Sequence, residues 1–208
     1  MEYDSVKCTR ATLSDLLPFE DNLDHLNLDG TPYMWGLLGK WDVVDDLDHG
    51  KVLKGTYRGP NEPRALRGES EWSHYRLEAN MKIDAGADAG LVFRVLPASG
   101  DYQCYICYLK DNGNGTGELG IAARYASIWW PLDDVDLAGS PANQWKAVAV
   151  EVTNVYNSGW WCQMKYYLNG ALQHTATVQN PLYPAGMIGL WVRQGSASFD
   201  NVTVSPLP

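Results

Sequence analysis

The chain has 208 residues and a formal net charge of −9, from 25 acidic and 16 basic side chains. Because binding to a phosphate backbone needs a surface rich in Lys and Arg, this balance excludes nucleic acid as the expected partner. No apolar run approaches the roughly 18 residues that a membrane-spanning helix needs, so the sequence also argues against a membrane protein.

The length is typical of one all-β domain, and we expect a single domain over residues 1–208. The 20 glycines and 11 prolines are spread along the chain, which favours many short elements joined by turns. Nine Trp and twelve Tyr against three Phe mean that most aromatic rings carry a polar atom. Such rings prefer positions where one edge meets water, a ligand or a hydrogen-bonding group.

The first segment with a periodic pattern, residues 13–17, predicts one helical turn ended by Pro18. Residues 39–46 and 51–55 then predict a β-hairpin with its turn at His49 and Gly50. The clearest pattern is at residues 75–83, where apolar and polar residues alternate without a break. This period of two predicts a strand with one buried face and one face in water.

Seven further segments predict strands, at residues 90–96, 101–111, 118–126, 145–154, 161–170, 185–194 and 198–204. Residues 112–117, rich in Asn and Gly, predict a turn between two of them. Residues 127–144 predict the longest loop, of a length that is typically functional or disordered. About ten strands without useful helical periodicity predict an all-β fold, a sandwich or barrel of antiparallel strands.

Four cysteines are present, and two of them, Cys104 and Cys107, are three residues apart in a predicted strand. Residues at this spacing point to opposite faces of a strand, so a shared metal or a redox pair is not expected. Cys8 and Cys162 could form a disulfide, but the sequence alone does not determine the pairing.

Nine short motifs follow one another over residues 19–204: FEDN, GKWDV, WSHYRLEA, AGLVFR, GDY, QWKAVAVEV, YLNG, GMIGL and FDNVTV. In this order they resemble the concanavalin A-like lectin/glucanase superfamily, in particular its laminin-G-like and bacterial glycan-binding modules. The resemblance implies a jelly-roll β-sandwich of two antiparallel sheets. It does not imply one activity, because this sandwich hosts lectins, binding modules, hydrolases and lyases.

The resemblance also implies a structural calcium ion where an acidic residue near the start of the chain meets the aspartate before the last strand. Carried over to this sequence, the ligands are Glu20 or Asp21, a backbone carbonyl near Gly39, and Asp200. Ca²⁺ takes six to eight oxygen ligands, so carboxylates and carbonyls from two chain ends would suit it. The alternative is that Asp200 begins an ordinary turn and that the acidic pair is solvated.

Glucanases of this superfamily carry their catalytic carboxylates on one strand in a Glu-x-Asp-x-x-Glu run, which this sequence lacks. Lyases of this fold commonly use a Gln-x-His strand, and that run is missing too. If the chain is an enzyme, the candidate acids are Glu69 and Glu71 before a strand, and Asp134 and Asp136 in the long loop. The sequence therefore favours a role without catalysis, with a glycoside hydrolase or polysaccharide lyase as the alternative.

Sugar rings offer an apolar C–H face that stacks on indole, and hydroxyls that bind planar polar groups. Strand alternation directs three side chains away from the core, and two loop tryptophans cannot both be buried easily. We therefore expect a ligand site on the concave sheet face, formed by Arg94, Gln103, Tyr105, Trp129, Trp130, Trp191 and Arg193. The register of the strand with Gln103 is ambiguous, and the alternative for Arg94 is packing against the sheet with Glu118 as its ion-pair partner.

These residues predict carbohydrate binding, with a polysaccharide or oligosaccharide as the partner. The chain would be a module of, or a companion to, a catalytic domain that degrades glycans. We expect it to act outside the cell or in the periplasm, although its first four residues do not open a signal peptide. A protein-interaction domain of the laminin-G kind is a third alternative.

Overall fold

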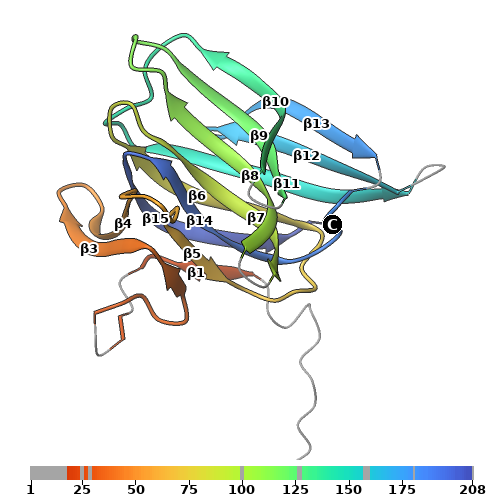
Figure 1. The fold of residues 1–208 in the computed structure, drawn as a ribbon, viewed down its shortest axis with the longest axis horizontal. Coiled ribbons are helices and arrows are strands. Elements are labelled where there is room, and N and C mark those ends of the chain that lie inside the picture. The colour runs from red at the N-terminus through yellow and green to blue at the C-terminus, as the bar shows by residue number, and fades with distance from the viewer. Residues whose placement is uncertain are drawn as a thin grey trace, which may run out of the picture.

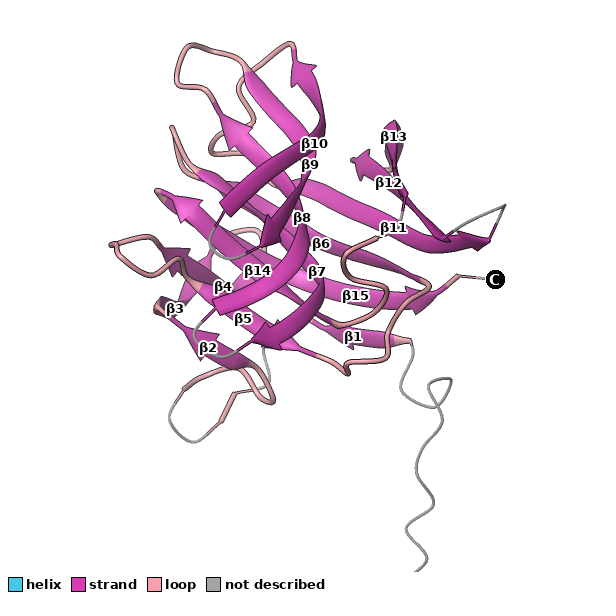
Figure 2. Cartoon of the chain, turned by 45° about the vertical axis from the view of Figure 1, so that its right-hand side comes forward, coloured by secondary structure: helices cyan, strands magenta, loops and turns pink. Residues whose placement is uncertain are grey.

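The computed structural model describes residues 18–23, 26–27, 30–98, 101–125, 128–156, 160–179 and 181–207. These residues form fifteen strands and no helix, so the predicted all-β class is confirmed (Figures 1 and 2). The helical turn predicted at residues 13–17 lies outside the described residues, as does Cys8. In the described parts of the chain, nothing has the form of a helix able to cross a membrane.

One antiparallel sheet has eight strands in the order β13-β12-β11-β6-β15-β4-β3, and the short strand β1 pairs with the second half of β15. Its strands are β1 (Phe19–Asp21), β3 (Lys40–Asp46), β4 (Gly50–Thr56), β6 (Tyr75–Ile83), β11 (Lys146–Tyr156), β12 (Trp160–Leu168), β13 (Ala171–Gln179) and β15 (Ser196–Pro206). The hairpin predicted at residues 39–46 and 51–55 is β3 and β4. The last strand, β15, lies inside the sheet between β6 and β4.

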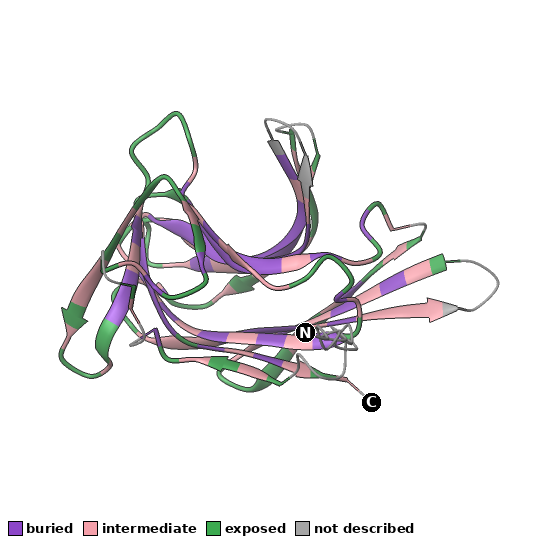
Figure 3. Ribbon diagram, turned by 90° about the horizontal axis from the view of Figure 1, so that it is seen from below, coloured by how far each residue is buried: buried purple, intermediate pink, exposed green. Residues whose placement is uncertain are grey.

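The other antiparallel sheet has seven strands in the order β10-β9-β8-β7-β14-β5-β2. Its strands are β2 (Gly36–Leu38), β5 (Arg64–Arg67), β7 (Asp88–Ala98), β8 (Asp101–Asp111), β9 (Gly117–Tyr125), β10 (Ile128–Leu137) and β14 (Met187–Gln194). The two sheets stack face to face, which confirms the predicted jelly-roll sandwich (Figure 3).

The main core lies between the two sheets and is built by strand alternation. In β6 every second residue from Tyr75 to Ile83 is fully buried, as the alternating sequence predicted, and the residues between them are partly exposed. Each fully buried Leu, Ile or Met side chain stabilises the fold by roughly 1.5–3 kcal/mol. The uninterrupted period of two therefore fixes the register of β6, because a slip by one residue would move all five buried side chains into water.

The seven-stranded sheet is strongly curved, and its hollow side is turned away from the eight-stranded sheet (Figure 3). Leu91 and Phe93 of β7 belong to the core between the sheets, whereas Val92 and Val95 belong to a second buried cluster on the opposite, concave face. This concave cluster also contains Tyr102, Cys104, Ile106, Tyr108, Ala122 and Trp191. The protein's own side chains therefore fill part of the hollow.

Five of the fifteen strands were not predicted from the sequence: the short strands β1, β2 and β5, and the longer strands β10 and β13. Residues 128–137 form the edge strand β10 rather than a loop, with a register shift between Pro131 and Asp133. Proline lacks the N–H that a regular ladder needs, so a segment that contains proline is not predicted as a strand from its sequence. Proline is nevertheless tolerated in an edge strand or at a bulge. The strand β13 is an edge strand with mostly exposed side chains, so it lacks the apolar alternation that marks a half-buried strand.

Candidate functional site

The concave face carries a pair of stacked indole rings that come from distant strands. Trp129 of β10 lies over Trp191 of β14, with ring centroids 5.3 Å apart and an angle of 11° between the planes. Four strand spacings separate β10 from β14, roughly 19 Å along a flat sheet. The rings meet because the sheet curls, and the contact leaves Trp191 fully buried and Trp129 partly exposed.

Glu62, just before β5, is held on this face by three donors. Its Oε2 atom accepts hydrogen bonds from the Trp191 indole N–H at 2.9 Å, from the Tyr102 hydroxyl at 3.0 Å and from the Arg124 guanidinium. Three donors on one oxygen fix the orientation of the carboxylate and leave Oε1 for a ligand. The Glu62 side chain keeps 20% of its surface exposed, so a small molecule can reach it.

Two arginines lie beside Glu62. The guanidinium carbon of Arg64 is 3.8 Å from the centroid of the Tyr102 ring, and that of Arg124 is 4.5 Å from it. Such cation–π contacts hold the two guanidinium planes against the ring and place positive charge beside Glu62. Burial, before any other cause, raises the pKa of the Tyr102 hydroxyl, which therefore stays a donor to Glu62 at neutral pH.

A second carboxylate, Asp88 at the start of β7, lies on the same face. It is 5% exposed, and the Arg193 guanidinium donates to its Oδ2 at 3.3 Å. Burial raises the pKa of Asp88 to about 6, although Arg193 and Lys110 oppose the shift. Its Oδ1 atom is buried without a hydrogen-bond partner among the described residues, a costly position for a carboxylate.

Arg193 and Tyr108 connect Asp88 to the indole pair. The Arg193 guanidinium carbon lies 4.7 Å from the Trp129 ring centroid, and Tyr108 meets the same ring edge-on at 5.3 Å. Burial, followed by the charges of Asp134, Glu118 and Asp88, raises the pKa of Tyr108. Acidic groups thus gather at one end of the hollow, and the arginines beside Glu62 lie at the other.

Of the predicted ligand residues, the structure brings together Trp129, Trp191 and Arg193 on the concave face, where alternation placed the last two. The predicted placement of Arg94 on the concave face was wrong. Arg94 is fully buried in the core, where its guanidinium donates to the backbone oxygens of Ser73 and Tyr183 and contacts the sulfur of Cys162.

A β-bulge explains the inward direction of Arg94. The pairing of β7 with β8 shifts register between Phe93 and Leu96, and Arg94 has a left-handed φ of 51°. The extra residue directs Phe93 and Arg94 to the same side of the sheet, which a strict period of two excludes. The proposed pairing of Arg94 with Glu118 is also wrong, because Glu118 binds Lys110 at 3.0 Å.

The predicted placement of Gln103, Tyr105 and Trp130 on the concave face was wrong as well. Tyr105 belongs to the core between the sheets, and Gln103 has the same parity on β8. The concave face of this strand is instead formed by Tyr102, Cys104, Ile106 and Tyr108. Trp130 follows Trp129 directly on β10, so it points away from the concave face, where it is 46% exposed beside Tyr125.

The four candidate acids do not form a pair of catalytic type across the site. Glu69 and Glu71 are exposed in the segment between β5 and β6, whereas Asp134 and Asp136 are exposed on β10. Four strands lie between β5 and β10 in the sheet. Of these acids, only Asp134 is close enough to affect a concave-face group, the Tyr108 hydroxyl.

The predicted calcium ligands are engaged by N–H donors. Asp21 accepts hydrogen bonds from the Trp35 indole at 2.9 Å and from Arg67 at 2.7 Å. Asp200 is 3% exposed and lies 2.6 Å from Nδ1 of His49. These carboxylates face nitrogen donors, whereas Ca²⁺ needs oxygens turned toward the ion.

Glu20 is exposed on β1 opposite Thr203, and Gly39 joins β2 to β3. Within the described residues, no three His, Cys, Asp or Glu side chains gather as a metal site would require. As arranged, the residues do not fit a calcium ion, and calcium stays a prediction from the resemblance alone.

The cysteine prediction is confirmed for the pair on β8. Cys107 belongs to the core between the sheets and Cys104 to the concave cluster, so the two thiols lie on opposite faces. Cys162 is a buried free thiol beside Arg94. Its proposed disulfide partner, Cys8, lies outside the described residues.

No sequence pattern pointed to Glu62, the most constrained group of the site. Glu62 stands between Asn61 and Pro63, outside any strand pattern, and it is recognised only through its three donors from β8, β9 and β14. A weak signal was present in the tyrosines of β8, because a tyrosine on an apolar face usually has a polar partner for its hydroxyl.

No curated protein matches the chain. Several solved structures share its fold at low identity. The carbohydrate binding module CBM66 from Bacillus subtilis has a TM-score of 0.62 at 18% identity, over 83% of this chain and 95% of that one. A β-glucanase from Bacillus licheniformis has a TM-score of 0.60 at 16% identity, over 91% and 98% of the two chains. A legume lectin-like domain from Entamoeba histolytica has a TM-score of 0.59 at 11% identity, over 95% and 100%.

These similarities confirm the concanavalin A-like fold that the sequence motifs indicated. A family model adds a more specific assignment, because it matches residues 27–205, most of the chain and all of the concave face. The chain belongs to the family of 3-keto-alpha-glucoside-1,2-lyase-like domains.

Proposed function

We propose that the concave face binds carbohydrate, with Glu62 as the central polar group. The observation that carries the proposal is the hydrogen bonding of Glu62. Its Oε2 atom accepts hydrogen bonds from Trp191, Tyr102 and Arg124. A carboxylate fixed in this way can accept a hydrogen bond from a sugar hydroxyl. The partly exposed Trp129 offers apolar indole surface to the C–H face of a sugar ring.

The fold relatives support this proposal, since they include a carbohydrate-binding module and glucanases. The partner would be an oligosaccharide or polysaccharide met outside the cytoplasm, and the chain would act with, or attached to, a catalytic domain. A structural calcium ion is not part of the proposal, because Asp21 and Asp200 face N–H donors.

The test of binding is isothermal titration of the full chain with cellohexaose, maltohexaose and laminarihexaose. We expect at least one of them to bind, and Glu62→Gln to weaken that binding at least tenfold, because the amide cannot replace a charged acceptor of three donors. Asp45→Asn, an exposed aspartate on the other sheet, is the control and should bind as the wild type does. Equal affinity of Glu62→Gln and wild type would refute a concave site centred on Glu62.

A second candidate function is cleavage of a 3-keto-α-glucoside, which the family assignment and Asp88 favour. A carbonyl at C3 acidifies the hydrogen at C2. A base that takes this proton sends its electron pair toward the C3 oxygen as an enolate; when the carbonyl re-forms, the C1–O bond breaks and a C1=C2 double bond appears. The departing alkoxide takes up a proton, so an unsaturated keto sugar and an alcohol are formed.

Asp88 has the properties of such a base. Its pKa of about 6 is near the working pH at which a general base is most effective, and its Oδ1 lacks a hydrogen-bond partner among the described groups. Arg193, beside it, offers positive charge to a developing enolate oxygen.

The test of cleavage is the release of methanol from methyl 3-keto-α-glucoside, followed together with the ultraviolet absorbance of the conjugated ketone. We expect release by the wild type and at least a hundredfold slower release by Asp88→Asn, with Asp45→Asn unchanged. Oligosaccharide binding without any methanol release would refute the lyase and leave the binding function in place.

A further inference from the structure

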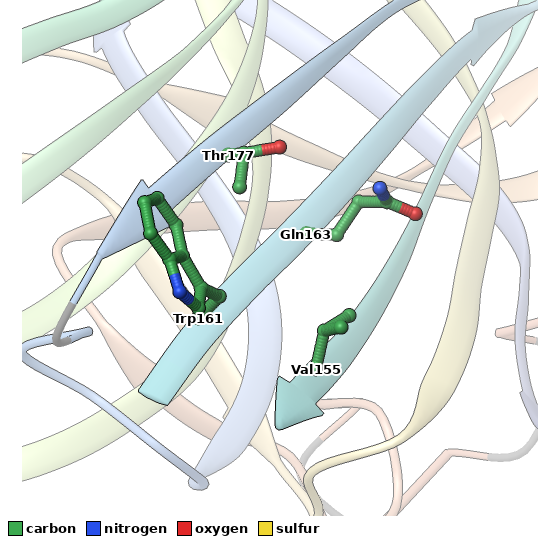
Figure 4. A pocket seen from close by; sticks show the side chains of 4 residues that line it. All are labelled: Val155, Trp161, Gln163 and Thr177. Atoms are coloured by element: carbon green, nitrogen blue, oxygen red, sulfur yellow. The ribbon is translucent and has the colours of Figure 1, made fainter. Parts of the chain in front are cut away.

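The outer face of the eight-stranded sheet has a hollow of about 190 Å³, lined by Val155 of β11, Trp161 and Gln163 of β12 and Thr177 of β13. Figure 4 shows the four side chains standing on three neighbouring strands, with the indole on one side and the amide on the other. Pockets that enclose drug-sized ligands are roughly 300–1,000 Å³, so this hollow suits one ring.

Strand alternation puts these side chains on the outer face. Cys162 and Met164 of β12 are fully buried in the core, so Trp161 and Gln163 point the opposite way. Trp161 is paired directly with Val155, and Gln163 with Thr177. Directly opposite side chains in antiparallel strands lie close together, which makes the four residues one continuous surface.

The lining is uncharged and has two kinds of group. The indole and the isopropyl group are apolar, whereas the Gln163 amide both donates and accepts and the Thr177 hydroxyl is exposed. An anion finds no cation among these lining groups, and an apolar ligand would leave the amide without a partner. A pyranose ring satisfies both, because its C–H face covers indole and its hydroxyls exchange hydrogen bonds with an amide.

We propose that this hollow is a second carbohydrate site, which binds one neutral glucosyl ring of a gluco-oligosaccharide. The concave site and this outer hollow lie on opposite faces of the sandwich, with both sheets and the core between them. Binding at one does not require binding at the other. When one site has bound a polysaccharide, the other site is held close to the same molecule, so its effective concentration is raised. The overall affinity then increases without any new contact.

The test uses the full chain with Glu62→Gln in every variant, so that the concave site is weakened throughout. Each variant is titrated with cellohexaose, maltohexaose and laminarihexaose. We expect at least one of these sugars to bind this background, and Trp161→Ala to weaken its binding at least tenfold. Trp160→Ala is the matched control: Trp160 is the neighbouring indole, 52% exposed, and it does not line the hollow, so its removal should change affinity less than twofold.

Thr177→Arg provides a second variant in case Trp161→Ala impairs folding. Thr177 is exposed, and an arginine there would occupy the hollow while leaving the core untouched, so we expect the same loss of binding. The proposal is overturned if none of the three sugars binds the Glu62→Gln background, or if Thr177→Arg binds as tightly as that background. Either result leaves the concave site unaffected, since that site is tested separately in the wild-type chain.

Discussion

Trp129 of the edge strand β10 covers Trp191 of the inner strand β14, and the two rings are nearly parallel at 5.3 Å. The same Trp191 donates its indole N–H to Glu62. The stack thus links an outer, partly exposed ring to the carboxylate at the centre of the proposed site. A ligand on the concave face would meet Trp129 and Glu62, while Trp191 positions the carboxylate from below.

Trp129→Ala is expected to weaken oligosaccharide binding at least tenfold and to lower the free energy of unfolding by about 1–3 kcal/mol, because it removes a ring from a half-buried stack. Urea denaturation and isothermal titration measure the two effects. Trp130→Ala is the control on the same strand, since Trp130 points to the other face and is 46% exposed. A Trp130→Ala variant with the larger loss of affinity would contradict the assigned site.

The raised pKa of Asp88 predicts a pH-dependent loss of stability. In the unfolded chain the carboxyl ionises near pH 3.8, and in the folded protein at about 6. Stability is therefore lost as pH rises from 3.8 to about 6, by on the order of 3 kcal/mol. We expect Asp88→Asn to gain stability relative to the wild type across this range in urea denaturation at a series of pH values.

Asp111 gives a matched control of opposite sign, because it is equally buried but its pKa is lowered by hydrogen bonds from Ser140 and the Gly86 amide. Its contribution is present above the ordinary pKa of an aspartate and is lost as pH falls through the lowered value. Asp111→Asn should therefore be less stable than the wild type at neutral pH. This difference in the free energy of unfolding should disappear in acid. The same pH trend in both variants would show that the buried environment of Asp88 has been misassigned.

Arg94→Met is expected to lower the free energy of unfolding by about 2 kcal/mol or more while leaving carbohydrate affinity within twofold of the wild type. The methionine cannot donate to the backbone oxygens of Ser73 and Tyr183, which remain buried. Arg193→Met should weaken carbohydrate binding, because Arg193 is 43% exposed and lies over Trp129. Denaturation and titration of both variants compare the structural role of Arg94 with the binding role of Arg193. A loss of affinity in Arg94→Met alone would indicate that Arg94 belongs to the binding site.

Removal of calcium is expected to leave the melting temperature unchanged. The carboxylate of Asp200 lies 2.6 Å from His49 Nδ1, and that of Asp21 is bound to Arg67, so neither offers free oxygens to the ion. Differential scanning calorimetry with EDTA and with added CaCl₂ measures the effect. A Tm that falls in EDTA and returns with calcium would support the ligand set implied by the family resemblance.

Sequence patterns predicted the fold where one face of a strand is buried and the other is wet. The alternation from Tyr75 to Ile83 is the clearest case, and the hairpin of β3 and β4 follows from its turn residues. Patterns failed where the backbone departs from regular pairing. A bulge reverses the direction of Arg94, and Pro131 together with a register shift conceals β10.

The candidate site was less predictable than the fold, because its residues come together only through sheet curvature. Alternation placed Trp191 and Arg193 on the correct face, yet it could not show that Trp129, four strands away, covers Trp191. Glu62 belongs to no periodic element, so its importance depends entirely on donors contributed by distant strands. Contacts between residues so far apart in the sequence cannot be recognised from the local composition around any one of them.

The position of β15 has a consequence for biosynthesis. This strand is synthesised after the other fourteen described strands, yet it pairs with β6 on one side and with β4 and β1 on the other. Until it emerges, β6 and β4 each present an unpaired edge that can associate with other nascent chains. The eight-stranded sheet can therefore close only after β15 has been synthesised, and chaperones that cover the two edges would prevent association during that interval.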